Sequence, residues 1–212
     1  MADFIDIHTH SARGNGRRVL NCRLGMESLE DISGPCSVGI HPWDAEVLYP
    51  TISTLLAQLE TAYCVAIGEI GLDKACKVDF GVQQKVFEAQ LCIAERRRLP
   101  VVIHCVRAQQ EVVKMLAKYA LPSVIFHGFI GSPEQVAELV KNRWFISFGF
   151  NALRSPKTIE ALRIVPLENV LLESDTDERS IEELYAEIAR IKEVELGLLK
   201  TEIENNYNKI FR

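Results

Sequence analysis

The sequence predicts a protein of the α/β class, with one (β/α)8 barrel of the TIM type that is abbreviated in its first βα units. Short β-branched runs recur along the 212 residues, and amphipathic segments separate most of them. This alternation indicates parallel strands joined by right-handed crossovers. Eight such strands close naturally into a barrel. Because no repeat, linker or low-complexity segment interrupts residues 1–212, we expect a single domain.

The expected strands are short runs rich in valine, isoleucine and phenylalanine. They cover residues 4–7, 19–22, 36–40, 65–69, 101–104, 124–127, 145–148 and 170–173. The first connections are short, since residues 11–18 are rich in glycine and arginine and residues 27–34 have room for only a turn or two. The early part of the barrel wall is therefore expected to lack full helices.

The expected helices follow the later strands. They cover residues 50–62, 82–98, 108–119, 133–142, 156–164, 181–191 and 201–210. Two of them begin with a serine and then a proline, at Ser132–Pro133 and Ser155–Pro156, which is a capping residue followed by the first helical position. Leu99–Pro100 ends the long helix and opens the next strand.

The composition is that of an ordinary globular protein, with 48% hydrophobic and 25% charged residues. The formal net charge of −5 gives no basic field, so a nucleic acid would need a local basic patch or bound cations. The six cysteines form no CxxC pair, which indicates reduced thiols. The start MADFIDIHTH does not read as a signal peptide, and no apolar run approaches a membrane span. We therefore expect a cytoplasmic protein.

All five histidines fall at the end of, or just after, a short apolar run. Two of them stand in IDIHTH, residues 5–10. Because side chains alternate along a strand, Ile5 and Ile7 share one side, while Asp6, His8 and His10 share the other. The two histidines then face the barrel axis at the carboxyl end of the first strand, where barrel active sites are built.

The same argument applies to the ends of the fourth, fifth, sixth and eighth strands. Four imidazoles and two carboxylates are expected to meet at one rim of the barrel: His8, His10, Glu69, His104, His127 and Asp175. Burying such groups unpaired costs several kcal/mol, and a divalent metal removes that cost. Six ligands exceed the need of one tetrahedral ion. Two divalent cations ~3.5–4 Å apart, sharing a carboxylate, fit the set better.

Each histidine also has a simpler interpretation. A single histidine after a strand is commonly a hydrogen-bonded core or loop residue. His41, which precedes Pro42 and Trp43, is compatible with a plain turn. Asp6 and Glu173 are expected to support the ligands by hydrogen bonds rather than to bind an ion.

Several longer phrases occur in a fixed order over nearly the whole chain: DIHTH, VGIHPW, AIGEIGLD, LPVVIHC, HGFIGSPEQVAELV, WFISFGF and NVLLESD, with NYNKIF near the end. Together they resemble the TatD family of metal-dependent deoxyribonucleases, within the amidohydrolase-type barrels. The resemblance implies two divalent cations with Glu69 as the bridge, and DNA as the substrate. One ion is then held by His8, His10, Glu69 and Asp175, and the other by Glu69, His104 and His127.

The chain departs from the family pattern in its substrate loops. It is shorter than typical members, and the segment between HTH and GIHP lacks most of a βα unit. HCVRA places Arg107 one position later than the family arginine, and TDERS replaces a proline-containing loop. These differences leave the expected metal ligands in place.

The predicted reaction is phosphodiester hydrolysis by a metal-bound hydroxide that attacks phosphorus in line. Asp175 is expected to orient the water and take its proton, Glu69 to bridge the ions, and His41 to contact the phosphate or protonate the leaving group. Four arginines are candidates for substrate binding, with a solvated charged loop as the alternative: Arg13, Arg17, Arg18 and Arg107.

Two other functions stay open at the level of sequence. The same cations could serve an amidase, a lactonase or a phosphomonoesterase, because they activate water toward carbonyl carbon and phosphorus alike. Alternatively, the barrel could bind metal or a partner without catalysis. Zinc, manganese, nickel, cobalt, iron and magnesium all suit mixed imidazole and carboxylate ligands. The sequence sets neither the oligomeric state nor the choice between exonuclease and endonuclease action.

Overall fold

The eight strands form one sheet whose order follows the chain from β1 to β8. The computed structural model describes residues 3–11, 16–30, 32 and 34–211. Within this part of the chain the paired strands run parallel, and helices separate the later strands. The predicted fold class, an α/β protein of the (β/α)8 type, is confirmed.

The chain divides into two compact units. Unit 1 combines Met1–Leu20 with Ile125–Arg212, and unit 2 is Asn21–Val124. The prediction of a single domain over residues 1–212 stays a prediction.

Unit 1 brings the first and last strands together. The parallel bridge joins Thr9 to Asp175, where the Asp175 N–H donates to the His8 carbonyl at 3.0 Å and the His10 N–H donates to the Asp175 carbonyl at 3.1 Å. Such pairing of the first strand with the segment after the last is what a closed ring of strands requires. The elements are β1 (Ile5–Thr9), the start of β2 (Arg17–Arg23), β6 (Val124–Phe126), α5 (Pro133–Lys141), β7 (Phe145–Phe148), η3 (Phe150–Arg154), α6 (Pro156–Ile164), η4 (Leu167–Asn169), β8 (Val170–Leu172), α7 (Ile181–Lys192) and α8 (Leu196–Ile210).

Helices α7 and α8 hold the strand ends of unit 1 through buried polar groups. The Tyr185 hydroxyl accepts from the Ile5 N–H at 3.1 Å and donates to the Ile5 carbonyl at 2.9 Å. The Asn206 amide donates to the carbonyls of Leu167 and Val170 at 2.8 and 2.9 Å. These bonds satisfy backbone groups that would otherwise be buried without partners.

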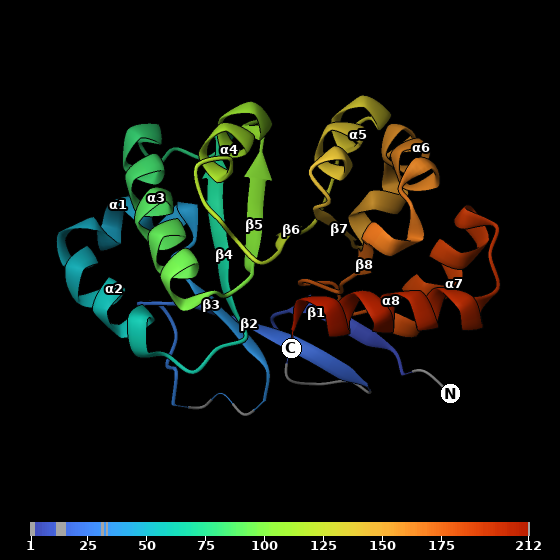
Figure 1. Ribbon diagram of the computed structural model, residues 1–212, viewed down its shortest axis with the longest axis horizontal. Helices are drawn as coiled ribbons and strands as arrows, with labels where there is room; N and C mark the ends of the chain where they lie inside the picture. Colours follow the sequence, from blue (N-terminus) through green and yellow to red (C-terminus); the bar gives the residue numbers. More distant parts are fainter. Residues whose placement is uncertain (1–2, 12–15, 31, 33, 212) are drawn as a thin grey trace. The chain divides into compact units, whose positions relative to one another are not determined.

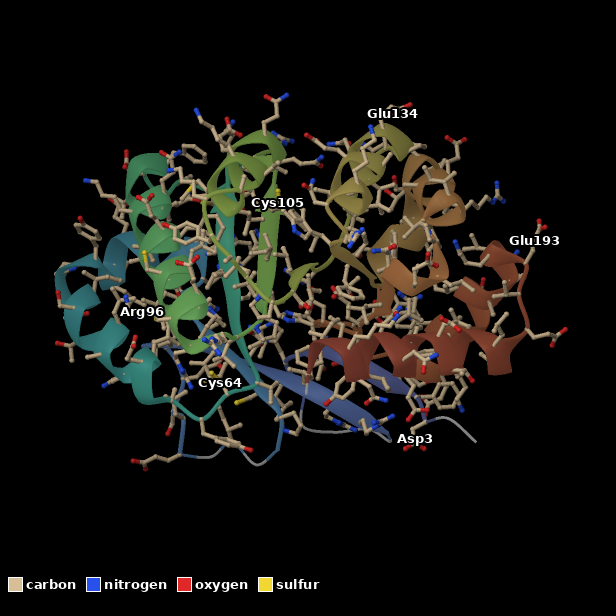
Figure 2. The ribbon with its side chains drawn as sticks, in the orientation of Figure 1. Asp3, Cys64, Arg96, Cys105, Glu134 and Glu193 are labelled. Carbon is tan, nitrogen blue, oxygen red and sulfur yellow. The ribbon has the colours of Figure 1, made fainter. Side chains whose placement is uncertain are left out.

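Unit 2 is arranged around the long helix α3, which packs against β4 (Figure 1). Arg96 near the end of α3, labelled in Figure 2, pairs with Glu60 at 2.8 Å, and Arg97 donates to the carbonyls of Leu59 and Ala62. The elements are β3 (Cys36–Gly39), η1 (Pro42–Asp44), α1 (Ala45–Leu48), η2 (Tyr49–Thr51), α2 (Ile52–Thr61), β4 (Ala66–Asp73), α3 (Phe80–Arg97), β5 (Val101–Val106) and α4 (Gln109–Leu116).

The structure corrects several predicted boundaries. The fourth strand continues to Asp73, four residues past its predicted end at residue 69. The reason is pairing with β5, which extends to Asp73 opposite Val106. The last helix begins at Leu196, five residues before the predicted start, and the short helix α1 was not predicted. The described part of residues 24–35 contains no helix, as the abbreviated early barrel predicts.

Each unit has its own apolar core. Phe126, Phe148 and Tyr185 are fully buried in unit 1, and Phe87, Ile67 and Leu72 in unit 2. Within the described part of the chain, no helix is both long and apolar enough to cross a membrane.

Candidate metal centre

The HxH motif and the acidic residue after β8 meet at the joined strand ends of unit 1. Nε2 of His8 lies 3.8 Å, and Nε2 of His10 lies 3.5 Å, from Oδ1 of Asp175. Ligand atoms of these three residues all lie within 4.8 Å of one another. The side chain of His8 is fully buried, whereas those of His10 and Asp175 are 27% and 32% exposed. One end of this cluster is therefore open to solvent.

The alternation of sides assumed for the first strand is interrupted. The register of β1 against β2 shifts between Asp6 and Thr9, where three steps along β1 match two along β2. Such a bulge turns side chains away from strict alternation and is common beside active sites. Asp175 itself adopts a left-handed backbone conformation, with φ of 52°.

His127 lies beside His8, and one of its nitrogens is already engaged. Its ring centroid lies 4.3 Å from that of His8. Its Nδ1 lies 3.2 Å from Oε1 of Glu173, which also accepts from the Gly128 N–H at 2.7 Å. Burial raises the pKa of Glu173, but the charge and hydrogen bond of His127 oppose this, and the net pKa lies below its usual value. Glu173 is thus a carboxylate that fixes Nδ1–H on His127 and leaves Nε2 as the donor for an ion.

Asp6 supports the segment that carries Asp175. Its two oxygens accept from the Ser174 N–H at 3.0 Å and from the Ser174 hydroxyl at 2.6 Å. Burial raises the pKa of Asp6 to about 6, although the Ser174 bonds lower it. Asp6 therefore acts on Asp175 through the residue beside it.

A second cluster occupies unit 2. Oε1 of Glu69 lies 2.6 Å from Nδ1 of His104 and 3.2 Å from Nε2 of His41. Ligand atoms of these three residues also lie within 4.8 Å of one another, and all three residues are buried. The structure thus places His41, which was predicted to contact substrate, directly beside Glu69.

A hydrogen bond assigns the proton on the His41 ring. The backbone N–H of Trp43 donates to Nδ1 of His41 at 3.1 Å, so in the neutral ring the proton is on Nε2, which faces Glu69. Burial lowers the pKa of His41 and favours this neutral form. Both nitrogens of His104 lie beside carboxylate oxygens, Nδ1 at 2.6 Å from Oε1 of Glu69 and Nε2 at 3.3 Å from Oδ2 of Asp73.

The backbone around Glu69 is held by a neighbouring strand. The Glu69 N–H donates to Oδ1 of Asn21 at 2.9 Å, and the Ser37 hydroxyl lies 3.2 Å from the same oxygen. The register of β4 against β5 shifts between Ile67 and Ile70, so Glu69 stands in a bulge. As in β1, the bulge redirects a candidate ligand.

The donors of both clusters suit divalent transition metals. Each cluster offers imidazole nitrogens with a carboxylate. Further carboxylates stand behind the histidines, Glu173 beside His127 and Asp73 beside His104. His41 fits a ligand role less well than Glu69 and His104, because the nitrogen that it turns toward Glu69 carries a proton. That Glu69 bridges two ions stays a prediction.

The four candidate arginines differ in position. Arg18 lines a cavity of about 680 Å³ together with His10, Asp175 and Arg179. Arg17 pairs with Glu204, lies 5.3 Å from the Tyr207 ring and stands opposite Ile5 at the start of β1; substrate binding by Arg17 stays a prediction. Arg107 is exposed and follows β5 with φ of 53°.

Arg13 lies outside the described residues.

The model of the family described as TatD related DNase matches residues 23–212. This chain belongs to the TatD-related DNase family. The human 3'-5' RNA nuclease TATDN2 is 32% identical over 181 residues, which are 74% of this chain and 24% of that protein. The uncharacterized metal-dependent hydrolase YabD of Bacillus subtilis is 30% identical over 197 residues, which are 83% of this chain and 76% of that protein.

A solved structure supports the fold of this TatD-family chain. YjjV, a TatD homolog from Escherichia coli K12, superposes with a TM-score of 0.83 at 23% identity, covering 98% of this chain and 97% of the other. At this identity the likeness shows the fold alone.

Sequence reasoning missed several residues that shape the two clusters. Asp73, Trp43 and Ser174 all contact candidate ligands or their neighbours. Asp73 and Ser174 stand in the phrases IGLD and ESD, next to residues that were considered. Gln83 and Gln90 of α3 accept from the N–H groups of Asp73 and Ile40, and no local pattern in the helix marks them as partners of strand ends.

Proposed function

We propose that this TatD-family chain is a divalent-metal-dependent phosphodiesterase that cleaves nucleic acid. The observation that supports this most directly is the meeting of His8, His10 and Asp175 at the joined ends of β1 and β8. Similarity to a human RNA nuclease adds support for a nucleic acid substrate. The chain spans only 24% of that relative and 76% of the Bacillus protein. The proposal of a nucleic acid substrate therefore depends mainly on the residues of the site and not on the names of these relatives.

The residues of both clusters would hold two divalent cations: His8, His10, His127 and Asp175 in unit 1, and Glu69 and His104 in unit 2. Bound cations would lower the pKa of water and offset the charge of a phosphodiester. Asp175 is partly exposed to the cavity and can accept a proton from the attacking water. His41 carries its proton on Nε2, 3.2 Å from Oε1 of Glu69, and can donate it to a phosphate or leaving-group oxygen that replaces this contact. Arg18 lines the same cavity as Asp175 and can contact a phosphate.

The test compares the unmodified protein with the His8→Ala/His10→Ala protein. Metal content is measured by mass spectrometry, and cleavage of single-stranded DNA and RNA oligonucleotides is measured with chelator and after manganese or zinc is added back. We expect the variant to lose at least about a hundredfold in rate, because metal assistance is worth several kcal/mol. Arg96→Ala, at an exposed position of α3, is the control.

The same assay separates the alternatives. Equal cleavage by the unmodified protein and the His8→Ala/His10→Ala protein would contradict the phosphodiesterase proposal. Chelator-sensitive turnover of a phosphate monoester or an N-acyl compound, without cleavage of DNA or RNA, would assign the site to another hydrolase. Metal binding without any turnover would indicate a binding protein. A cytoplasmic location stays a prediction.

A further inference from the structure

A half-exposed tryptophan stands beside the unit 2 cluster. Trp43 is 52% exposed. Its ring centroid lies 4.6 Å from that of His41 and 5.9 Å from that of His104, both nearly edge-on. The neighbours Pro42 and Asp44 are buried, so Trp43 is the exposed residue of the turn Pro42–Asp44. One indole face matches the size of one planar group, and stacking on it buries far less area than a protein interface.

The ring is held in one orientation. Nε1 of Trp43 donates to Oδ2 of Asp73 at 2.7 Å. The backbone N–H bonds to His41, and the next residue, Asp44, accepts from Arg23 at 2.6–2.9 Å. Because the indole is already ordered, a ligand that stacks on it pays little conformational entropy.

We infer that Trp43 is a stacking site for a nucleobase of a single-stranded nucleic acid, beside the phosphodiester that is cleaved. The inference rests on the proposed function and names a contact for its substrate. A nucleobase is the planar group that a nucleic acid brings next to a phosphate, and stacking tolerates every base. In a chain of net charge −5, stacking supplies affinity that a basic surface supplies in other nucleic-acid-binding proteins.

Fluorescence tests the contact without cleavage. The chain has two tryptophans, so Trp144→Phe leaves Trp43 as the sole indole. A single-stranded phosphorothioate hexanucleotide is titrated in the presence of chelator. We expect saturable quenching of the Trp43 emission, and much weaker quenching by an abasic hexamer of the same charge. Unchanged emission up to millimolar hexanucleotide would overturn the inference.

Kinetics separates stacking from a structural role through Asp73. Trp43→Leu and Trp43→Phe both remove the N–H bond to Asp73, but only Phe keeps an aromatic face. Stacking predicts that Trp43→Leu lowers kcat/KM for an oligonucleotide roughly five- to 150-fold, mostly by raising KM. Trp43→Phe is expected to retain most of the wild-type kcat/KM. Equal losses in the two variants would assign Trp43 to positioning Asp73 and overturn the inference.

A control and a second substrate complete the test. Tyr63→Leu replaces another exposed aromatic of unit 2, 88% exposed, and is expected to leave kcat/KM unchanged. With an abasic oligonucleotide as substrate, the ratio of kcat/KM for the wild type to kcat/KM for Trp43→Leu is expected to fall toward one. If no nucleic acid is cleaved, the proposed function fails and the quenching still decides the contact. If cleavage is strong and Trp43→Leu matches wild type, the stacking inference alone fails.

Discussion

At the scale of single residues, one buried carboxylate determines which nitrogen of His127 is available to an ion. Oε1 of Glu173 accepts from Nδ1 of His127 and from the Gly128 N–H, and the whole side chain is excluded from solvent. A ligand histidine without such a partner loses orientation and basicity. The negative charge of Glu173, in addition to its position, is therefore expected to strengthen metal binding by His127.

Glu173→Gln is expected to weaken the binding of zinc or manganese about 10- to 100-fold, because the amide keeps an acceptor at this place but removes the negative charge. Isothermal titration calorimetry on protein first stripped of metal measures the change. Glu193→Gln makes the same substitution at an exposed position just after α7, labelled in Figure 2, and serves as the control. Unchanged affinity in Glu173→Gln would show that His127 is no ligand or needs no carboxylate.

At the scale of elements, α3 holds two strand ends of unit 2 through glutamines two turns apart. Gln90 accepts from the Ile40 N–H at 2.7 Å and donates to the Ile40 carbonyl at 3.1 Å, directly before His41. Gln83 likewise accepts from the Asp73 N–H at 2.8 Å and donates to the Asp73 carbonyl at 3.0 Å. Both glutamines are buried. The helix thereby fixes the backbone directly before His41 and on both sides of the Asp73 side chain.

Gln90→Leu is expected to lower the free energy of unfolding by about 2 kcal/mol or more, because it leaves a buried N–H and a buried carbonyl without partners. Urea unfolding followed by circular dichroism measures the change. Gln84→Leu makes the same substitution at a half-buried position of the same helix and is expected to cost much less. Equal effects of the two substitutions would show that the Ile40 bonds contribute little.

At the scale of the whole molecule, candidate ligands come from segments far apart in the chain. In unit 1, His8 and His10 lie near one end of the sequence, while His127 and Asp175 come from its second half. An ion that binds such a set binds only the folded chain, and mass action then stabilises that chain.

Divalent metal at about one hundred times its dissociation constant is expected to stabilise the protein by roughly 2.7 kcal/mol. For a chain of this length this corresponds to a rise in Tm of about 5–10 °C. Differential scanning calorimetry with chelator and with added metal measures the shift. The His8→Ala/His10→Ala protein is expected to show a much smaller rise, and an equal rise in both proteins would place the stabilising metal elsewhere.

Much of the fold was predictable because its signals are local. Strands 145–148 and 101–104 are recognisable as β-branched or aromatic runs, and the helix at Pro133 begins with a capping serine that the structure confirms. The positions of His8, His10 and Asp175 also follow from the chain, because the carboxyl ends of parallel strands share one edge of a sheet.

Other features depend on partners that are distant in sequence. Arg17 stands near the HxH motif in the chain, yet it pairs with Glu204 at the opposite end of β1. The bulges in β1 and β4 depend on the register of neighbouring strands, which no single run of residues specifies.

By itself, the sequence determined which side chains reach the strand ends and hence the chemistry that they can perform. Only the tertiary structure decided the protonated nitrogens of His41 and His127, the anchoring of Trp43 and the role of the α3 glutamines. The physical reason is that hydrophobic periodicity is a property of neighbouring residues. A hydrogen bond between buried polar groups exists only once folding has brought its two partners together.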